Sequence, residues 1–112
     1  MLYNVTKKTV VVNNLRIAGS FKERLTGLMF RKSIGSSEGL MLMGCNAIHT
    51  CFMRFSLDVV FMDMNYRVVY IKEKIKPWRQ SGFIHKAHIA LELPEGTVNK
   101  KNIAVGDILF PG

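Results

Sequence analysis

The sequence predicts a mainly β fold of the α+β kind, with one or two short helices, built either as a small barrel or as two packed antiparallel sheets. Three observations predict it. Short β-branched or apolar runs bounded by turn residues fill most of the chain, one segment has helical periodicity, and 48% hydrophobic with 21% charged residues is typical of a globular domain. The 112 residues contain no linker long enough to divide them, so we expect a single domain over residues 1–112.

The strand candidates are runs of β-branched or apolar residues between polar, glycine or proline residues. They occupy Thr9–Val12, Leu15–Ala18, Gly39–Met43, Ala47–Met53, Leu57–Met62, Arg67–Lys76, Ala87–Leu93 and Asp107–Phe110. The first two are separated by Asn13 and Asn14, which tolerate turn conformations, so we expect a tight hairpin there. A second hairpin is expected around the turn from Asp63 to Tyr66.

One segment has the pattern of an amphipathic helix. Ser20 with Glu23 three residues later is a capping box, in which each residue caps a backbone amide of the other. Apolar residues recur behind it at helical spacing, namely Phe21, Leu25, Leu28 and Met29. The pattern predicts a helix from about Ser20 to Phe30, followed by a loop from Lys32 to Glu38.

The chain is strongly basic, with 16 Lys and Arg against 8 Asp and Glu, a net charge of +8 and a pI near 9.8. Such a balance favours an anionic partner, such as nucleic acid, an acidic protein or a lipid surface. Lys72, Lys74 and Lys76 would share one face of a regular strand with Tyr70, whose ring could stack on bases. The alternative is that these lysines protect an exposed sheet edge or keep the protein soluble.

The two cysteines, Cys45 and Cys51, are too few for a disulfide scaffold, which indicates a reducing compartment. The first residues of the sequence do not resemble a signal segment, and no run is long and apolar enough to span a membrane. We therefore expect a cytoplasmic protein without a membrane span.

The segment Arg24-Leu25-Thr26-Gly27-Leu28-Met29-Phe30-Arg31 resembles the R-x-x-G-L-M-x-R signature of the domain-of-unknown-function 192 (DUF192) family, also called UPF0127. Further landmarks of that family follow in order: Gly39-Leu40, His49 to Met53, Leu57 to Phe61, Arg67 to Val69, Ala90 to Pro94 with Gly96, and Val105-Gly106-Asp107. The resemblance covers roughly residues 15–110. It implies a compact, mainly β fold and no established activity.

Asp58 lies in an otherwise mostly apolar run, where an ionised carboxylate is costly unless it is paired or hydrogen-bonded. It either accepts hydrogen bonds from backbone amides or pairs with Arg24 or Arg31 to fix the fold. Alternatively, it lines a polar pocket together with an arginine. Glu92 lies on the strand face opposite its apolar neighbours. We expect that face to be exposed to solvent, the alternative being a pocket wall.

His49 and Cys51 are two residues apart, so on a strand both side chains would point to one face. An imidazole with a thiolate suits zinc or a nucleophile with its base, and His85 and His88 could complete a set of four ligands. The alternative is a buried cysteine beside a hydrogen-bonded histidine. Because the spacing matches no structural zinc signature, we predict no metal and no cofactor.

These patterns predict a non-enzymatic binding module for an unknown ligand or partner. The sequence contains no phosphate loop, nucleophile elbow, zinc-protease motif or dinucleotide fingerprint, and we assign no catalytic residue. The residues expected to bind the ligand are Arg24, Arg31, His49, Asp58 and Glu92. Two alternatives remain: a nucleic-acid-associated protein that uses the basic strand face, and a small His/Cys metal-dependent enzyme.

Overall fold

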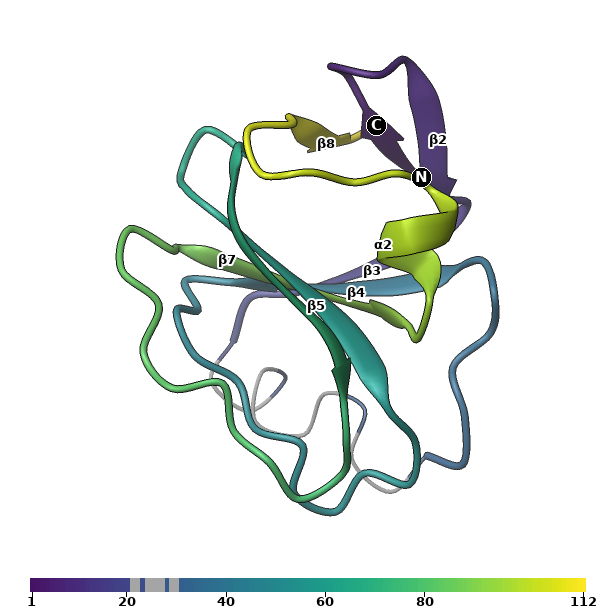
Figure 1. The fold of residues 1–112 in the computed structure, drawn as a ribbon, viewed down its shortest axis with the longest axis vertical. Coiled ribbons are helices and arrows are strands. Elements are labelled where there is room, and N and C mark those ends of the chain that lie inside the picture. Colours follow the sequence, from purple (N-terminus) through teal and green to yellow (C-terminus); the bar gives the residue numbers. More distant parts are fainter. Residues whose placement is uncertain (21–22, 24–27, 29–30) are drawn as a thin grey trace.

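The computed structural model describes residues 1–20, 23, 28 and 31–112, and within them the chain forms two packed sheets (Figure 1). The smaller sheet contains β1 (Leu2–Asn4), β2 (Thr9–Val12) and β8 (Leu109–Pro111), in the order β2-β1-β8. The larger sheet contains β3 (Asn14–Ala18), β4 (Glu38–Met43), β5 (Leu57–Met62), β6 (Val68–Ile75) and β7 (Ile89–Pro94), in the order β3-β4-β7-β5-β6. A short helix, α2 (Thr97–Lys100), follows β7.

The predicted mainly β fold with two packed sheets is confirmed, and the described strands do not close into a barrel. The second hairpin lies where the sequence predicted it, between β5 and β6. In its turn, Asp63 Oδ1 accepts the amides of Asn65 and Arg67 at 2.8 and 3.0 Å. Among the described strand pairs only β3 with β4 is parallel, so the expectation of antiparallel sheets holds for all of these pairs but one.

The central strands of the larger sheet are apolar at successive positions, and successive side chains point to opposite sides. The sheet is therefore apolar on both faces. On β5, Val60 and Met62 point towards the smaller sheet, whereas Val59 and Phe61 point the other way. The residues between the two sheets form what we call the first core, and those on the other face form the second core. In the described part of the chain, residues outside the strands cover the second core, and they include Leu28, Ile48, Met53 and Ala87.

The predicted hairpin between Thr9–Val12 and Leu15–Ala18 is wrong. β2 pairs with β1 in the smaller sheet, while β3 pairs with β4 in the larger one. The chain leaves the smaller sheet after Val12 and enters the larger sheet at Asn14, and Val12 and Leu15 both pack in the first core between the two sheets. Packing of the two strands in different sheets therefore overrides the turn preference of the asparagines.

Two further segments differ from the predictions. Ala47–Met53 is a loop rather than a strand, with one isolated bridge between His49 and Gln80. The helix α2 was not predicted, since four residues are too few to show helical periodicity; it begins after Gly96, which has a left-handed φ of 90°. No helix in the described part of the chain is long and apolar enough to cross a membrane.

The predicted helix from Ser20 to Phe30 lies mostly outside the described residues. Its capping box is within them. The Glu23 amide donates to Ser20 Oγ at 3.1 Å, and the Ser20 amide donates to Glu23 Oε1 at 3.2 Å. These are the two reciprocal hydrogen bonds that the sequence pattern predicts.

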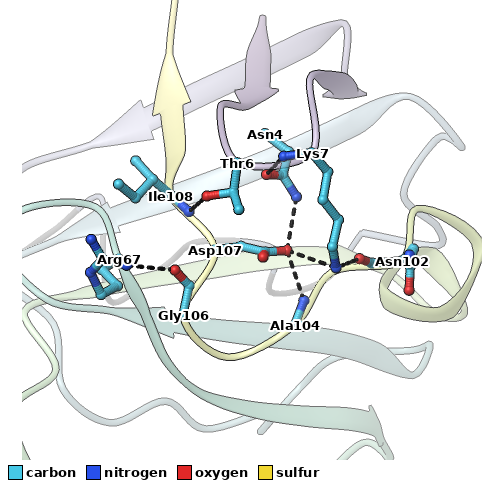
Figure 2. A network of polar contacts seen from close by, with 9 residues as sticks. All are labelled: Asn4, Thr6, Lys7, Arg67, Asn102, Ala104, Gly106, Asp107 and Ile108. Carbon is cyan, nitrogen blue, oxygen red and sulfur yellow. Dashed lines mark hydrogen bonds and ion pairs between the residues drawn. The ribbon is translucent and has the colours of Figure 1, made fainter.

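A polar network joins the turn between β1 and β2 to the segment that leads into β8 (Figure 2). The buried Asp107 Oδ2 accepts hydrogen bonds from Asn4 Nδ2 and the Ala104 amide, both at 3.0 Å, and forms an ion pair with Lys7 Nζ at 3.1 Å. Burial by itself would raise the pKa of Asp107, but the Asn4 and Ala104 hydrogen bonds and the Lys7 charge hold that pKa below its ordinary value. The carboxylate therefore stays ionised and fixes the smaller sheet.

Candidate functional site

Two loops cover much of the second core, residues 44–56 and 76–88, and we call them together the loop ribbon. In Figure 1 they lie on the side of the larger sheet that faces away from β8. Backbone hydrogen bonds of 2.8–3.0 Å join them in antiparallel order: Cys45 N to His88 O, Ile84 N to Asn46 O, Ser81 N to Ile48 O, Thr50 N to Arg79 O, and Trp78 N to Thr50 O. The two loops are therefore connected almost as two strands would be.

Thr50 anchors the loop ribbon from inside. Its side chain is 0% exposed, its hydroxyl donates to Lys76 O at 2.6 Å, and the Arg79 amide donates to Oγ1 at 2.8 Å. A buried hydroxyl is costly unless its hydrogen bonds are made, and here it both donates and accepts. Thr50 thereby holds the backbone of residues 76 to 79 in place.

An open pocket of about 500 Å³ lies on the loop ribbon, and its lining residues are His49, Cys51, Trp78, Arg79 and Gln80. The Cys51 amide donates to His49 Nδ1 at 3.2 Å. In the neutral ring the proton therefore resides on Nε2, which remains the donor of this imidazole. The pocket thus combines an imidazole, a guanidinium, a carboxamide, a thiol and an indole.

Trp78 and Phe52 form an aromatic pair at this pocket. Their ring centroids are 4.7 Å apart with edge-to-face geometry, and the residues are 58% and 47% exposed. Both have a left-handed backbone, with φ of 62° and 65°, which is unfavourable for bulky side chains. Burial of the rings does not account for this strain, because both are exposed. Strained conformations are concentrated at functional sites, so this pair marks the ribbon as a candidate.

The loop ribbon carries half of the net charge of the chain. It contains four basic residues, Arg54, Lys76, Arg79 and Lys86, and no Asp or Glu, which gives +4 of the total +8. All four are exposed. The ion pairs found among the described residues lie elsewhere, between Lys7 and Asp107 and between Arg31 and Glu38. The ribbon is therefore a positive surface without carboxylates of its own.

Arg31, one of the two arginines expected to bind a ligand, is not among the described residues that line the pocket. Arg24 lies outside the described residues. Arg31 Nη2 contacts both carboxylate oxygens of Glu38 at 3.2 Å, and Glu38 also accepts the Gly35 amide at 2.9 Å. The Gly35 amide, together with Arg31, holds the pKa of Glu38 below its ordinary value, even though burial opposes the shift. Arg31 therefore connects its loop to the start of β4.

Asp58 is buried and its two oxygens are used within the fold. Oδ1 accepts the Lys74 amide at 3.0 Å, and Oδ2 accepts the Val98 amide in the first turn of α2 at 2.9 Å. Because Leu57 and Val59 point into the second core, Asp58 points to the opposite side of the larger sheet, away from the loop ribbon. The sequence offered two interpretations of Asp58, and these contacts match the one in which it accepts hydrogen bonds from backbone amides. Asp58 does not join His49 among the described residues that line the pocket.

The prediction that Glu92 faces solvent is wrong, because the residue is only 4% exposed. It lies on the second-core face of β7, between Leu40 of β4 and Val59 of β5. No ion pair joins its side chain to another residue in the described ranges. Burial raises the pKa of Glu92 to about 7. The alternation of β7 indicated the correct face, but the alternation does not reveal that loops cover it.

A β-bulge interrupts the lysine row predicted on β6. Two residues of β6 lie opposite the single residue Asp58 of β5, and Lys74 in the bulge has a φ of 55°. The extra residue reverses the alternation, so that Ile75 is buried on the face where a regular strand would continue the row of lysines. Tyr70 and Lys72 still share a face, but Lys74 does not extend it.

His49 and Cys51 do not lie on a strand, so the argument that a strand aligns them fails, although both line the pocket. His49 is engaged by the backbone amide of Cys51 rather than by its thiol. Among the residues that the structure describes, no three His, Cys, Asp or Glu side chains gather in a way that could hold a metal ion.

Sequence reasoning missed Thr50, Arg79 and Gln80 as parts of a site, and it named Trp78 only as an aromatic residue near the lysine row that could stack on bases. Two signals were available in the sequence. Trp78 is the only tryptophan of the chain and stands beside Arg79, and both segments of the loop ribbon lack acidic residues. The pairing of the two segments could not be predicted, because it depends on hydrogen bonds between irregular loops.

Comparisons with known proteins identify the family. The chain matches DUF192, described as Uncharacterized ACR, over residues 3–110. It is 34% identical over 110 residues to the UPF0127 protein PH1112 of Pyrococcus horikoshii, which covers 96% of this chain and 95% of that protein. It is also 34% identical over 111 residues to a UPF0127 protein of Thermococcus sibiricus, covering 96% of this chain and 71% of that protein.

Two solved structures, both 22% identical to this chain, share its fold. A protein of unknown function from Novosphingobium aromaticivorans DSM 12444 has a TM-score of 0.76, covering 87% of this chain and 74% of that one. A protein from Sinorhizobium meliloti 1021 that has been suggested to be a transcription regulator has a TM-score of 0.81, covering 97% and 88%. The family match and the relatives above 30% identity confirm the resemblance of the motifs: the chain belongs to the DUF192 (UPF0127) family, whose function is unknown.

Proposed function

We propose that this protein is a binding module whose ligand is an anion with a planar group, held in the pocket of the loop ribbon. The composition of that pocket carries the proposal, because the Arg79 guanidinium, the His49 imidazole and the Trp78 indole line one open volume of about 500 Å³. A guanidinium binds carboxylate or phosphate oxygens through paired hydrogen bonds, and an indole ring packs against planar groups. Neither loop of the ribbon contains a carboxylate that would compete for Arg79.

The position of His49 favours binding over catalysis. A cysteine nucleophile needs a base that hydrogen-bonds to its sulfur. In this pocket His49 Nδ1 instead accepts the backbone amide of Cys51, at 3.2 Å. The imidazole is therefore arranged to donate from Nε2, as a group that binds an anion does.

Titration with phenyl phosphate should test this proposal, because the single tryptophan contributes one indole signal to a nitrogen–proton correlation spectrum. The ligand should shift the Trp78 indole signal saturably, whereas phenol, which has the ring without the charge, should not. Arg79→Gln should weaken binding about tenfold or more, since hydrogen bonds to charged groups contribute about 1.5–3 kcal/mol.

The matched control is Arg16→Gln, which removes the same charge from an exposed position on β3, at the sheet edge opposite β6. It should change the affinity by no more than about twofold, because Arg16 is not among the described residues that line the pocket and its interaction with the ligand would be screened by solvent and salt. The proposal fails if phenyl phosphate at about 10 mM leaves the indole signal unmoved. It also fails if the two arginine variants weaken binding equally.

A further inference from the structure

We infer that the loop ribbon takes single-stranded nucleic acid, an inference that rests on the proposed function and extends it from one anionic group to a chain of them. A single strand presents a charged phosphate and a planar base with every nucleotide. A surface that binds it without sequence preference combines cations that follow the backbone with aromatic rings that stack on the bases. The loop ribbon has both features.

The cations come from both loops of the ribbon. Arg54 lies on the first loop, and Lys76, Arg79 and Lys86 lie on the second, and all four are exposed. None of them has an ion pair with a carboxylate in the described part of the chain. Their charges are therefore available to phosphates.

The rings lie on the same two loops. Phe52 and Trp78 form the strained edge-to-face pair, and Phe83, which follows Gly82, is 73% exposed. These three exposed aromatic residues of the ribbon lose favourable burial, unless a partner covers them. Trp78 is 58% exposed, so much of its indole is open to a base that stacks on it.

The pocket favours a nucleic acid strand over a lipid surface, which exposed aromatic and basic residues can also contact. His49, Arg79 and Gln80 adjoin Trp78 in the pocket. Insertion of the indole among acyl chains would bring these polar groups towards an apolar layer without partners. Bases and phosphates instead supply hydrogen-bonding groups to all three. A duplex fits less well, because its bases are already stacked.

Strand β6 is a weaker location for such a partner than the ribbon. The bulge leaves Tyr70 and Lys72 as the part of the predicted row that still shares a face. One ring and one cation would contact only a short length of a single-stranded nucleic acid. The ribbon offers three rings and four cations.

Fluorescence anisotropy of a labelled oligothymidine of about 12 nucleotides tests the inference. The full chain should bind it, with a slope of log affinity against log salt of about −3 if four phosphates are neutralised at about 0.7 each. Trp78→Ala should weaken binding about tenfold or more, and Trp78→Phe should restore most of it. Lys86→Gln should reduce the magnitude of the salt slope by about 0.7.

The control for an exposed apolar side chain is Met64→Ala, in the turn between β5 and β6, which should leave the affinity unchanged. Thermal melting of each variant separates loss of contact from loss of fold. The inference is overturned if Tyr70→Ala weakens binding more than Trp78→Ala, since the oligonucleotide would then lie on β6. It is also overturned if the protein sediments with vesicles of phosphatidylserine and phosphatidylcholine and the oligonucleotide does not compete.

The two proposals can fail separately. If phenyl phosphate binds in the pocket and the oligonucleotide binds no more tightly than phenyl phosphate, the nucleic acid inference falls and the proposed function stands. If neither shifts the Trp78 signal, both fall. Oligonucleotide binding that Trp78→Ala and Arg79→Gln both weaken supports both.

Discussion

Replacing Asp58 by asparagine should lower the melting temperature by about 10 °C or more, because each carboxylate oxygen accepts one backbone amide inside the protein. Asparagine keeps the shape but turns an NH₂ group towards the amide of Lys74 or of Val98. It also removes the charge that strengthens both hydrogen bonds. The expected cost is about 2–4 kcal/mol in the free energy of unfolding, which circular dichroism at neutral pH would measure.

The control for Asp58→Asn is Glu73→Gln, which removes the same charge from an exposed neighbour of the bulge residue Lys74. It should change the free energy of unfolding by less than about 0.5 kcal/mol. A D58N protein that melts with the wild type would contradict the structural role of Asp58. A D58N protein that melts early and loses α2, as seen in the amide signal of Val98, would support it.

Glu92→Gln should make the protein more stable than the wild type at pH 8, and about equally stable at pH 4. Burial raises the pKa of Glu92 from 4.5 to about 7, so between these values the folded protein holds a proton that the unfolded chain has lost. The wild type therefore loses stability as pH rises through this window, by about 3 kcal/mol in total. Glutamine is uncharged at every pH and removes this loss.

Denaturant unfolding at a series of pH values measures the effect of Glu92→Gln. The matched control, Glu95→Gln, neutralises an exposed carboxylate three residues away and should keep the slope of the wild type between pH 4.5 and 7. Parallel curves for wild type and Glu92→Gln across that window would show that the carboxyl group is not isolated in the second core.

The strands of the larger sheet could be predicted because the local pattern and the tertiary environment agree. Leu57–Met62 is apolar at every position but one, and it is β5 at those bounds. Thr9–Val12 was also correctly predicted as a strand, but it pairs with β1 and not with Leu15–Ala18. The pairing depends on which sheet each strand joins, and no local pattern contains that information. Burial of Glu92 was missed for the same reason, since the loops that cover it come from elsewhere in the chain.

The candidate site was harder to predict than the fold. His49 was identified from its chemistry, but as part of a strand with Cys51, and Asp58 was expected beside it. The larger sheet separates these two residues, because Asp58 occupies the face opposite the loops. Trp78 and Arg79 enter the pocket through the hydrogen bonds of Thr50, a residue that has no distinctive sequence signal.

Ligand-binding loops are commonly among the least protected parts of a protein and order themselves on binding. In the loop ribbon the amides of Thr50, Trp78 and Arg79 are bonded within the protein. They should therefore exchange with deuterium as slowly as the amides of strands. The indole and guanidinium groups carried by this backbone are preorganised, so little of the binding free energy is lost to the entropy of ordering them. Affinity at this surface should consequently respond to changes in the ligand more than to changes in loop flexibility.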